Sequence, residues 1–105
     1  MSGLLGLLGL GLRGRLVVLG VNGVRAELKS GTIRCVVLAA DASPRAVEKV
    51  ARLAEGSGVP LVRGPSAAEI GVRLGRPPVM VVGVRDRGMA DGILRAAPGR
   101  DVTED

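Results

Sequence analysis

The chain has 105 residues, the length of one domain, and 47% of them are apolar, so a hydrophobic core can form. It has no Phe, Tyr or Trp, which excludes modules that stack bases on aromatic rings, and no His, which removes the commonest general base and metal ligand. Fifteen basic residues against ten acidic ones give a net charge of +5, which favours a polyanionic partner.

The leucine- and glycine-rich residues 4–12 predict the first helix. Four leucines recur near one helical face: Leu4, Leu5, Leu8 and Leu12. The segment lacks a basic start and a clear cleavage site, and it is shorter than the roughly 20 apolar residues that span a bilayer. We therefore expect a partly buried helix and no membrane partner. Residues 9–14 spell GxGxxG, but a dinucleotide fingerprint must follow a strand, so chance explains this motif better.

A short strand at residues 16–19 precedes the second predicted helix, residues 20–31. The apolar residues of this helix recur at helical spacing, and we place Asn22 as its N-cap and Gly31 at its end. Arg25 and Lys29 then lie four residues apart on one exposed face. A solvated face and a phosphate contact are equally compatible with that position.

Residues 33–40 form an unbroken apolar run, which predicts a strand buried on both faces. This run holds Cys35, the only cysteine, so the chain can form neither an internal disulfide nor a thiolate zinc site. A buried structural thiol in a reducing cytoplasm is expected. Asp41 follows as a turn or cap residue. Ser43 is expected to cap the next helix with Pro44 at its first position, and a Gly-Ser-Gly sequence ends that helix.

Two strands and a short helix are predicted in the next segment. Residues 59–62 form a short strand with Pro60 at its start or at a sheet edge. The sequence Ser-Ala-Ala-Glu at residues 66–69 is a capping box, and it opens a helix that Gly75 ends. Residues 79–84 are expected to form a second buried strand.

Asp86 is expected to cap the last helix, and Pro98-Gly99 to end the ordered chain. Residues 1–98 are therefore predicted to be a single domain and residues 99–105 a flexible tail. Helices that alternate with buried strands predict an α/β fold, a three-layer α/β/α sandwich with a small four-stranded mixed sheet. Residues 33–62 would form a right-handed βαβ crossover. Because no carboxylate has a partner at a catalytic spacing, we expect no enzyme activity, no cofactor, no metal and no small-molecule substrate.

Several short segments between about Leu4 and Ile93 carry a family resemblance through their order and spacing. They are Leu7-Leu8-Gly9-Leu10, Leu19 to Arg25, Val36 to Pro44, Gly58 to Val62, Glu69 to Gly71, Leu74 to Arg76, and Val79 to Val84. Together they resemble the L7Ae/L30e/S12e/Gadd45 ribosomal-protein superfamily, and within it the small bacterial YlxQ-type, L7Ae-like proteins.

The resemblance implies an L30e-like sandwich that recognises kink-turn or similarly bent structured RNA, ribosomal RNA included, through backbone and arginine contacts. In archaeal members the second helix starts with an Asn-Glu pair and then a Lys, which read tandem sheared G·A pairs. The matching positions are Asn22, Gly23 and Ala26, of which only Asn22 agrees. The second family contact is the loop before the last strand. The candidate RNA-binding residues are Gly20, Asn22, Gly23, Arg25, Lys29, Asp41, Arg76, Pro77, Pro78 and Val79.

Physical arguments from the residues support such a site but leave alternatives open. A helix N-terminus with free N–H groups binds phosphate, and Gly20 and Gly23 let a backbone approach closely. Asn22 is equally typical of a helix cap, and Pro77-Pro78 of a rigid turn. We expect a cytoplasmic, non-catalytic RNA-binding protein with the ribosome as a candidate partner. The rival is a Gadd45-like protein-interaction adaptor on the same fold without RNA binding.

Overall fold

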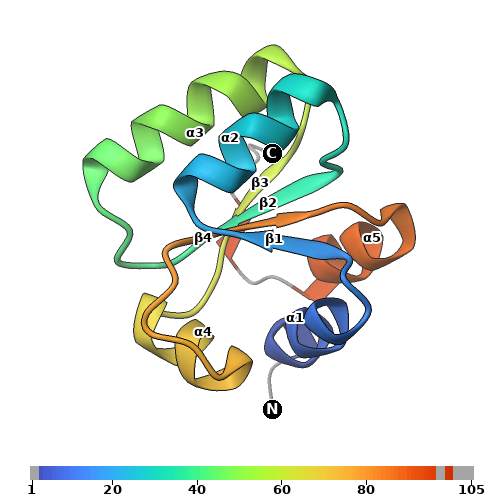
Figure 1. Ribbon diagram of the computed structural model, residues 1–105, viewed down its shortest axis with the longest axis vertical. Coiled ribbons are helices and arrows are strands. Elements are labelled where there is room, and N and C mark those ends of the chain that lie inside the picture. Colours follow the sequence, from blue (N-terminus) through green and yellow to red (C-terminus); the bar gives the residue numbers. More distant parts are fainter. Residues whose placement is uncertain (1–2, 97–98, 101–105) are drawn as a thin grey trace.

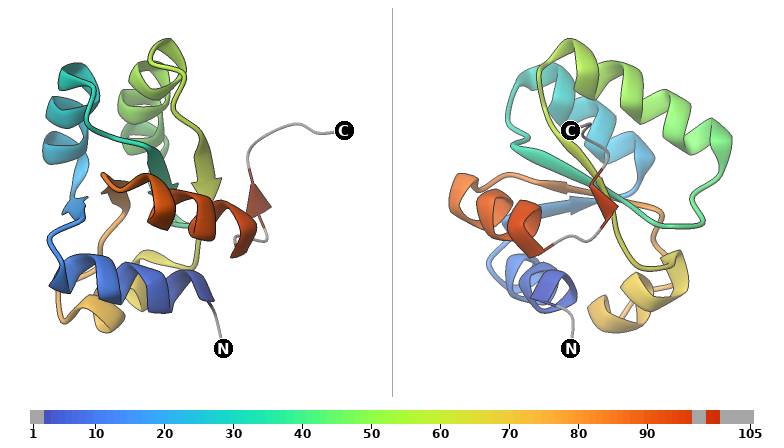
Figure 2. Two further views of the ribbon diagram at one scale, coloured as in Figure 1. Left: turned by 90° about the vertical axis from the view of Figure 1, so that its right-hand side faces the viewer. Right: turned by 180° about the vertical axis from the view of Figure 1, so that it is seen from behind.

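Helices α2 and α3 cover one face of a central sheet, and α1, α4 and α5 cover the other (Figure 1). The computed structural model describes residues 3–96 and 99–100. The elements in chain order are α1 Gly3–Arg13, β1 Val17–Leu19, α2 Val21–Ser30, β2 Cys35–Leu38, α3 Pro44–Gly56, β3 Leu61–Arg63, α4 Ala67–Leu74, β4 Val81–Val84, α5 Arg87–Ala96 and β5 Gly99–Arg100. The predicted three-layer α/β/α sandwich is confirmed, and Figure 2 shows the layers from two further sides.

The sheet has the strand order β1-β4-β2-β3-β5. Strands β2 and β3 are parallel, as the predicted crossover requires, while β4 runs antiparallel to both β1 and β2. These four strands are the predicted mixed sheet. The two residues of β5 pair antiparallel with β3 and extend the sheet by a fifth strand. Gly99 and Arg100, the first two residues of the predicted tail, thus lie in a strand, while residues 101–105 lie outside the described residues.

The core consists of two aliphatic clusters, one on each face of the sheet. Strand β2 supplies both, because its side chains alternate: Val36 and Leu38 join the α2-side cluster, and Cys35 and Val37 join the α1-side cluster. All four residues are fully buried, as the unbroken apolar run predicts. With no aromatic ring in the chain, the clusters are filled by Leu, Ile, Val and Ala from the covering helices.

Cys35 is expected to be unreactive in the folded protein. Burial raises the pKa of its thiol to about 12, because a thiolate would be desolvated in the α1-side cluster. At pH 8 the native protein should therefore take up no iodoacetamide over hours, and it should react at once in denaturant. Mass spectrometry of the quenched protein measures both. Rapid labelling under native conditions would mean that the sheet opens locally around β2.

Most helix ends follow the sequence signals. The Ser43 hydroxyl accepts a hydrogen bond from the Ala46 amide at 3.2 Å, and both bonds of the Ser66–Glu69 capping box are present. The prediction of Asn22 as the cap of α2 is wrong. Gly20 holds that place with φ 93°, and no side chain caps the helix. Asn22 lies inside the first turn of α2, so its side-chain amide does not cap the start of the helix.

An ion pair ties α2 to the end of β4. The Arg85 guanidinium donates from Nε to Glu27 Oε1 at 2.7 Å and from a terminal nitrogen to Oε2 at 2.6 Å. Its other terminal nitrogen donates to the Arg15 carbonyl at 2.8 Å. This bidentate geometry lowers the pKa of the Glu27 carboxyl and raises that of Arg85.

The Glu27–Arg85 pair should make stability depend on pH in acid. A carboxyl whose folded pKa lies below its ordinary 4.5 stabilises the protein above that value and loses the effect as pH falls through the folded pKa. Glu27→Gln should therefore cost about 0.5–1 kcal/mol at pH 7, a figure discounted for solvent screening, and much less near pH 2. Urea unfolding across pH measures the difference. Glu55→Gln, on the exposed side of α3, is the control and should show no such trend.

Candidate nucleic-acid interface

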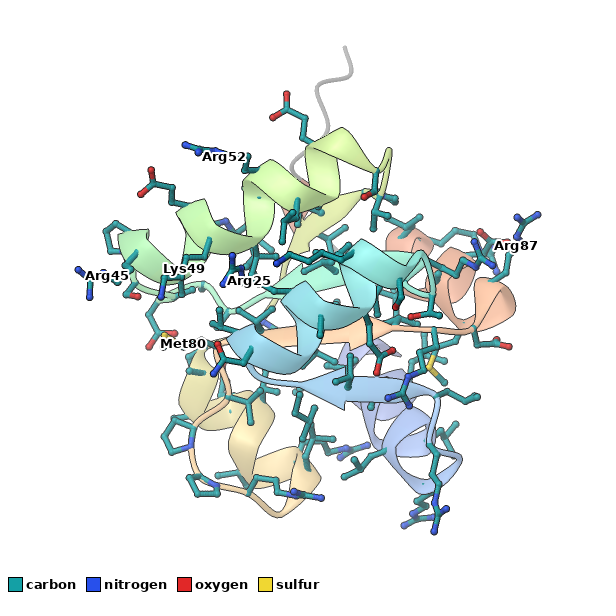
Figure 3. The ribbon with its side chains drawn as sticks, turned by 45° about the horizontal axis from the view of Figure 1, so that its top comes forward. Arg25, Arg45, Lys49, Arg52, Met80 and Arg87 are labelled. Atoms are coloured by element: carbon teal, nitrogen blue, oxygen red, sulfur yellow. The ribbon has the colours of Figure 1, made fainter. Side chains whose placement is uncertain are left out.

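A hollow of about 450 Å³ lies where the starts of α2 and α3 meet. From β1 and α2 it is lined by residues 19–23, and from α3 by Ser43, Arg45, Ala46 and Lys49. Met80 closes it from the strand side, and its sulfur lies 3.5 Å from the Ser43 amide. Figure 3 shows Met80 beside the first turn of α2, with Arg45 and Lys49 across from it on α3.

A second hollow of about 350 Å³ adjoins the first. It shares residues 19–21 and Met80, and its other wall is the segment 76–79 that follows α4. We call the lining of both hollows the α2-start surface. Met80 lies between them with 37% of its surface exposed, although the sequence places it in a buried strand. The prediction that Met80 lies in a buried strand is wrong, because β4 begins at Val81, one residue after Met80.

The backbone of α2 is open at this surface. Gly20 has a positive φ of 93°, and apart from its chain neighbours no heavy atom of the described residues lies within 4 Å of the place a Cβ would take. Its amide donates to the Val81 carbonyl at 2.9 Å, and the Val24 amide donates back to the Gly20 carbonyl at 3.1 Å. The amides of residues 21–23 therefore lie at the uncapped end of the helix, where they can donate to an anion.

Gly23 packs closely against β1, which explains why glycine fits at this position. A Cβ at this position would lie 2.7 Å from Cγ2 of Val18, a stiff β-branched side chain on β1. The first turn of α2 therefore packs directly on β1. A larger side chain would have to move the helix away from the strand, so the glutamate that the family resemblance matches to this position does not fit this backbone without that shift.

The loop after α4 is held against its own helix. Gly75 ends α4 in the left-handed region with φ 69°, and the Arg76 amide donates to the Gly71 carbonyl at 2.8 Å. Arg76, Pro77 and Pro78 are exposed. Val79 differs from them: only 8% of its surface is exposed and its amide donates to the Ala67 carbonyl, so its side chain anchors the loop in the core.

The remaining candidates lie at different distances from this surface. Arg25 is half-buried and lines a groove between α2 and α3. Lys29 lies seven residues beyond Asn22, about 10 Å further along the helix axis, in the last turn of α2. The Asp41 carboxylate accepts a hydrogen bond from the Ala67 amide at 2.8 Å and thereby ties the end of β2 to the start of α4.

The sequence pattern missed three residues of the α2-start surface. No motif in the sequence marks Arg45 or Lys49 as site residues, and Met80 falls within the predicted buried strand of residues 79–84. The spacing of Arg45 and Lys49 by four residues was the available signal for a shared basic face. Their position opposite Gly20 depends on the packing of α3 beside α2, and no local sequence pattern predicts that packing.

Across residues 3–96 and 99–100, no three His, Cys, Asp or Glu side chains gather closely enough to hold a metal ion. In the same residues, no helix combines the length and the apolarity needed to cross a membrane.

Comparison with known proteins gives consistent matches. The chain is 34% identical to the RNA-binding protein YlxQ of Bacillus subtilis (strain 168), over 84% of this chain and 88% of that protein. A Bacillus halodurans protein of unknown function has the same fold, with a TM-score of 0.87 at 24% identity, covering 91% of this chain and 97% of that one. The 15.5kD RNA binding protein of Giardia lamblia matches with a TM-score of 0.74 at 25% identity, over 90% and 84% of the two chains. The family model of the Ribosomal protein L7Ae/L30e/S12e/Gadd45 family matches residues 4–93, so the chain belongs to that family.

Proposed function

We propose that this protein binds structured RNA, and that its ligand is a kink-turn or a similarly bent RNA held at the α2-start surface. The uncapped amide end of α2, exposed between two adjoining hollows, carries the proposal. Phosphate oxygens would accept from the amides of residues 21–23, and the open backbone at Gly20 would let the RNA approach. The protein would act without catalysis, in the cytoplasm, on ribosomal or other bent RNA.

Two further observations support an RNA ligand over another polyanion. The YlxQ relative and the Giardia lamblia neighbour are both named as RNA-binding proteins. The chain has no aromatic ring on which single-stranded bases can stack, so recognition would rest on backbone shape and charge. A bent duplex offers both, because its phosphates follow a curve that a straight duplex lacks.

Binding to three RNAs of equal length tests the proposal. A kink-turn RNA should bind more tightly than a straight duplex or a single strand, and its affinity should fall linearly with salt on logarithmic axes. Arg76→Ala and Asn22→Ala, both at exposed positions, should each weaken kink-turn binding about three- to tenfold. Thermal unfolding should hardly change, since neither side chain is buried.

Arg34→Ala is the matched control, because it also removes one exposed arginine but lines a separate hollow that shares no residue with the α2-start surface. It should leave the affinity unchanged. Equal binding of bent and straight RNA would contradict shape recognition. Failure to bind any of the three would contradict RNA binding and favour the protein-interaction adaptor.

A further inference from the structure

A row of basic side chains runs along α3 beyond the α2-start surface. Arg45, Lys49 and Arg52 are spaced by four and three residues, so they share one helical face, and all three are exposed. The row extends about 10 Å along the helix axis. Figure 3 shows it rising from Arg45 and Lys49 near Met80 to Arg52 further along the helix, with Arg25 lying between α2 and α3.

A groove between α2 and α3 continues the α2-start surface along this row. It has a volume of about 290 Å³ and is lined by Arg25, Glu48, Lys49, Arg52 and Leu53. Lys49 lines both this groove and the hollow at the start of α2. An extended ligand could therefore follow the surface from Gly20 into the groove without leaving the protein.

The groove has more donors than acceptors. Nε of Arg25 is buried and makes no hydrogen bond within the described residues. Among the described residues that line the groove, Glu48 has the only carboxylate. It lies 3.6 Å from a terminal nitrogen of Arg52, and the side chains of Glu48 and Arg52 are 72% and 82% exposed. An ion pair that exposed contributes little and opens easily. Three basic side chains thus line the groove against one acid, with Arg45 beside them, an arrangement that suits a ligand with several negative charges.

We propose that Arg25, Arg45, Lys49 and Arg52, called here the α3 strip, bind the phosphate backbone of an RNA duplex that extends from the bend. This proposal rests on the proposed function, because the bend at the α2-start surface would direct the stem along α3. The strip favours a nucleic-acid backbone because Leu53 is the only apolar residue among the described residues that line the groove, and a protein interface needs a larger apolar centre. A chain of phosphates, in contrast, matches separated basic side chains.

Three RNAs with the same bend test the strip. One has two short stems, and in each of the other two a different stem is extended by about ten base pairs, roughly one turn of a duplex. The triple variant Arg45→Gln, Lys49→Gln, Arg52→Gln is compared with Arg34→Gln, Arg87→Gln, Arg95→Gln, which removes the same charge at exposed positions away from the strip. Wild type should bind one extended RNA more tightly than the short one. The strip variant should lose that gain, about tenfold or more, and its salt slope should fall by about two to three, near 0.9 per lost contact.

The outcomes separate this proposal from the proposed function. If wild type does not prefer bent RNA, the proposed function fails, and the strip is still tested by the salt slopes of both variants on a straight duplex. The strip is overturned if its variant keeps the wild-type affinity and slope on every extended RNA, or if the control variant loses as much. Anionic phosphatidylserine vesicles provide a further test. Vesicle binding that the strip variant alone loses, with RNA binding intact, would assign the strip to a membrane surface and overturn the proposal.

Discussion

Gly71→Ala is expected to weaken RNA binding by tenfold or more, although residue 71 lies inside α4 and lines neither of the two hollows. A Cβ at Gly71 would lie 2.8 Å from the Arg76 carbonyl oxygen and closer still to that of Pro77. Both contacts are backbone atoms, which cannot rotate away as a flexible side chain could. The loop from Arg76 to Pro78 must therefore move off the helix, and with it one wall of the α2-start surface.

The same change should also lower stability, by about 1–3 kcal/mol, the usual range for overpacking. The hydrogen bond from the Arg76 amide to the Gly71 carbonyl lengthens as the loop moves, which outweighs the better helix propensity of alanine. RNA affinity and urea unfolding should be measured on the same preparation, at a temperature where the variant is fully folded. If the folded variant binds RNA more weakly, the loss shows that the loop after α4 has moved.

Gly56→Ala is the matched control for this experiment. Gly56 is the last residue of α3, and apart from its chain neighbours and the backbone of its own helix, no heavy atom in the described part of the chain lies within 4 Å of the place its Cβ would take. Alanine there should stabilise the protein by about 0.4–1 kcal/mol, because it restricts the unfolded chain, and leave RNA binding unchanged. If Gly71→Ala retains wild-type affinity, the loop after α4 is not part of the interface.

The fold was predictable because capping residues and glycines in the sequence mark where most of its helices begin and end. Gly31 and Gly75 end their helices in the left-handed conformation that glycine adopts without strain, and Ser43 and Ser66 cap theirs. Strands β2 and β4 contain no polar residue, so both faces of the sheet had to be covered by helices. The pairing of β5 with β3 was missed, because a strand of only two residues, Gly99 and Arg100, carries no periodic signal.

The candidate site was predictable only in part. The start of α2 and the loop after α4 followed from short motifs, but the basic face of α3 did not, since its role depends on how α3 packs beside α2. The Glu27–Arg85 pair joins residues 58 positions apart and has no local signature. The exposure of Met80 was hidden for a similar reason. An apolar residue next to a buried strand is typical of the core, and only the start of β4 at Val81 places it outside.

Gly83→Ala should destabilise the protein by about 1–3 kcal/mol, because α2 rests directly on the sheet at this glycine. A Cβ there would lie 2.9 Å from Cδ1 of Ile33, 3.0 Å from Cγ1 of Val18 and 3.2 Å from Cγ2 of Val24. These atoms belong to the α2-side cluster, which has no ring or long flexible side chain to absorb the change. Urea unfolding at neutral pH measures the loss.

The change at Gly83 should be partly rescued by Ile33→Val. This substitution removes Cδ1, the atom nearest the new methyl group, and alone it should cost about 0.5–1.5 kcal/mol through the cavity it leaves. The double variant should be destabilised by about 1 kcal/mol less than the sum of the two single changes. The new methyl group at residue 83 would occupy the space that the loss of Cδ1 from Ile33 leaves empty. Ile93→Val is the control, because Ile93 is equally buried but packs in the α1-side cluster on the opposite face. Its cost should add to that of Gly83→Ala within about 0.5 kcal/mol.

Additive costs for Gly83→Ala and Ile33→Val would contradict local crowding and would indicate another way of relieving the clash. Helix α2 would then move away from the sheet as a body, because Val18 and Val24 would otherwise still crowd the new methyl group. That movement would shift Gly20 and the uncapped amides against the loop after α4. Gly83→Ala would then weaken kink-turn binding. If the side chains of the α2-side cluster instead absorb the clash, the α2-start surface and the affinity for kink-turn RNA stay unchanged.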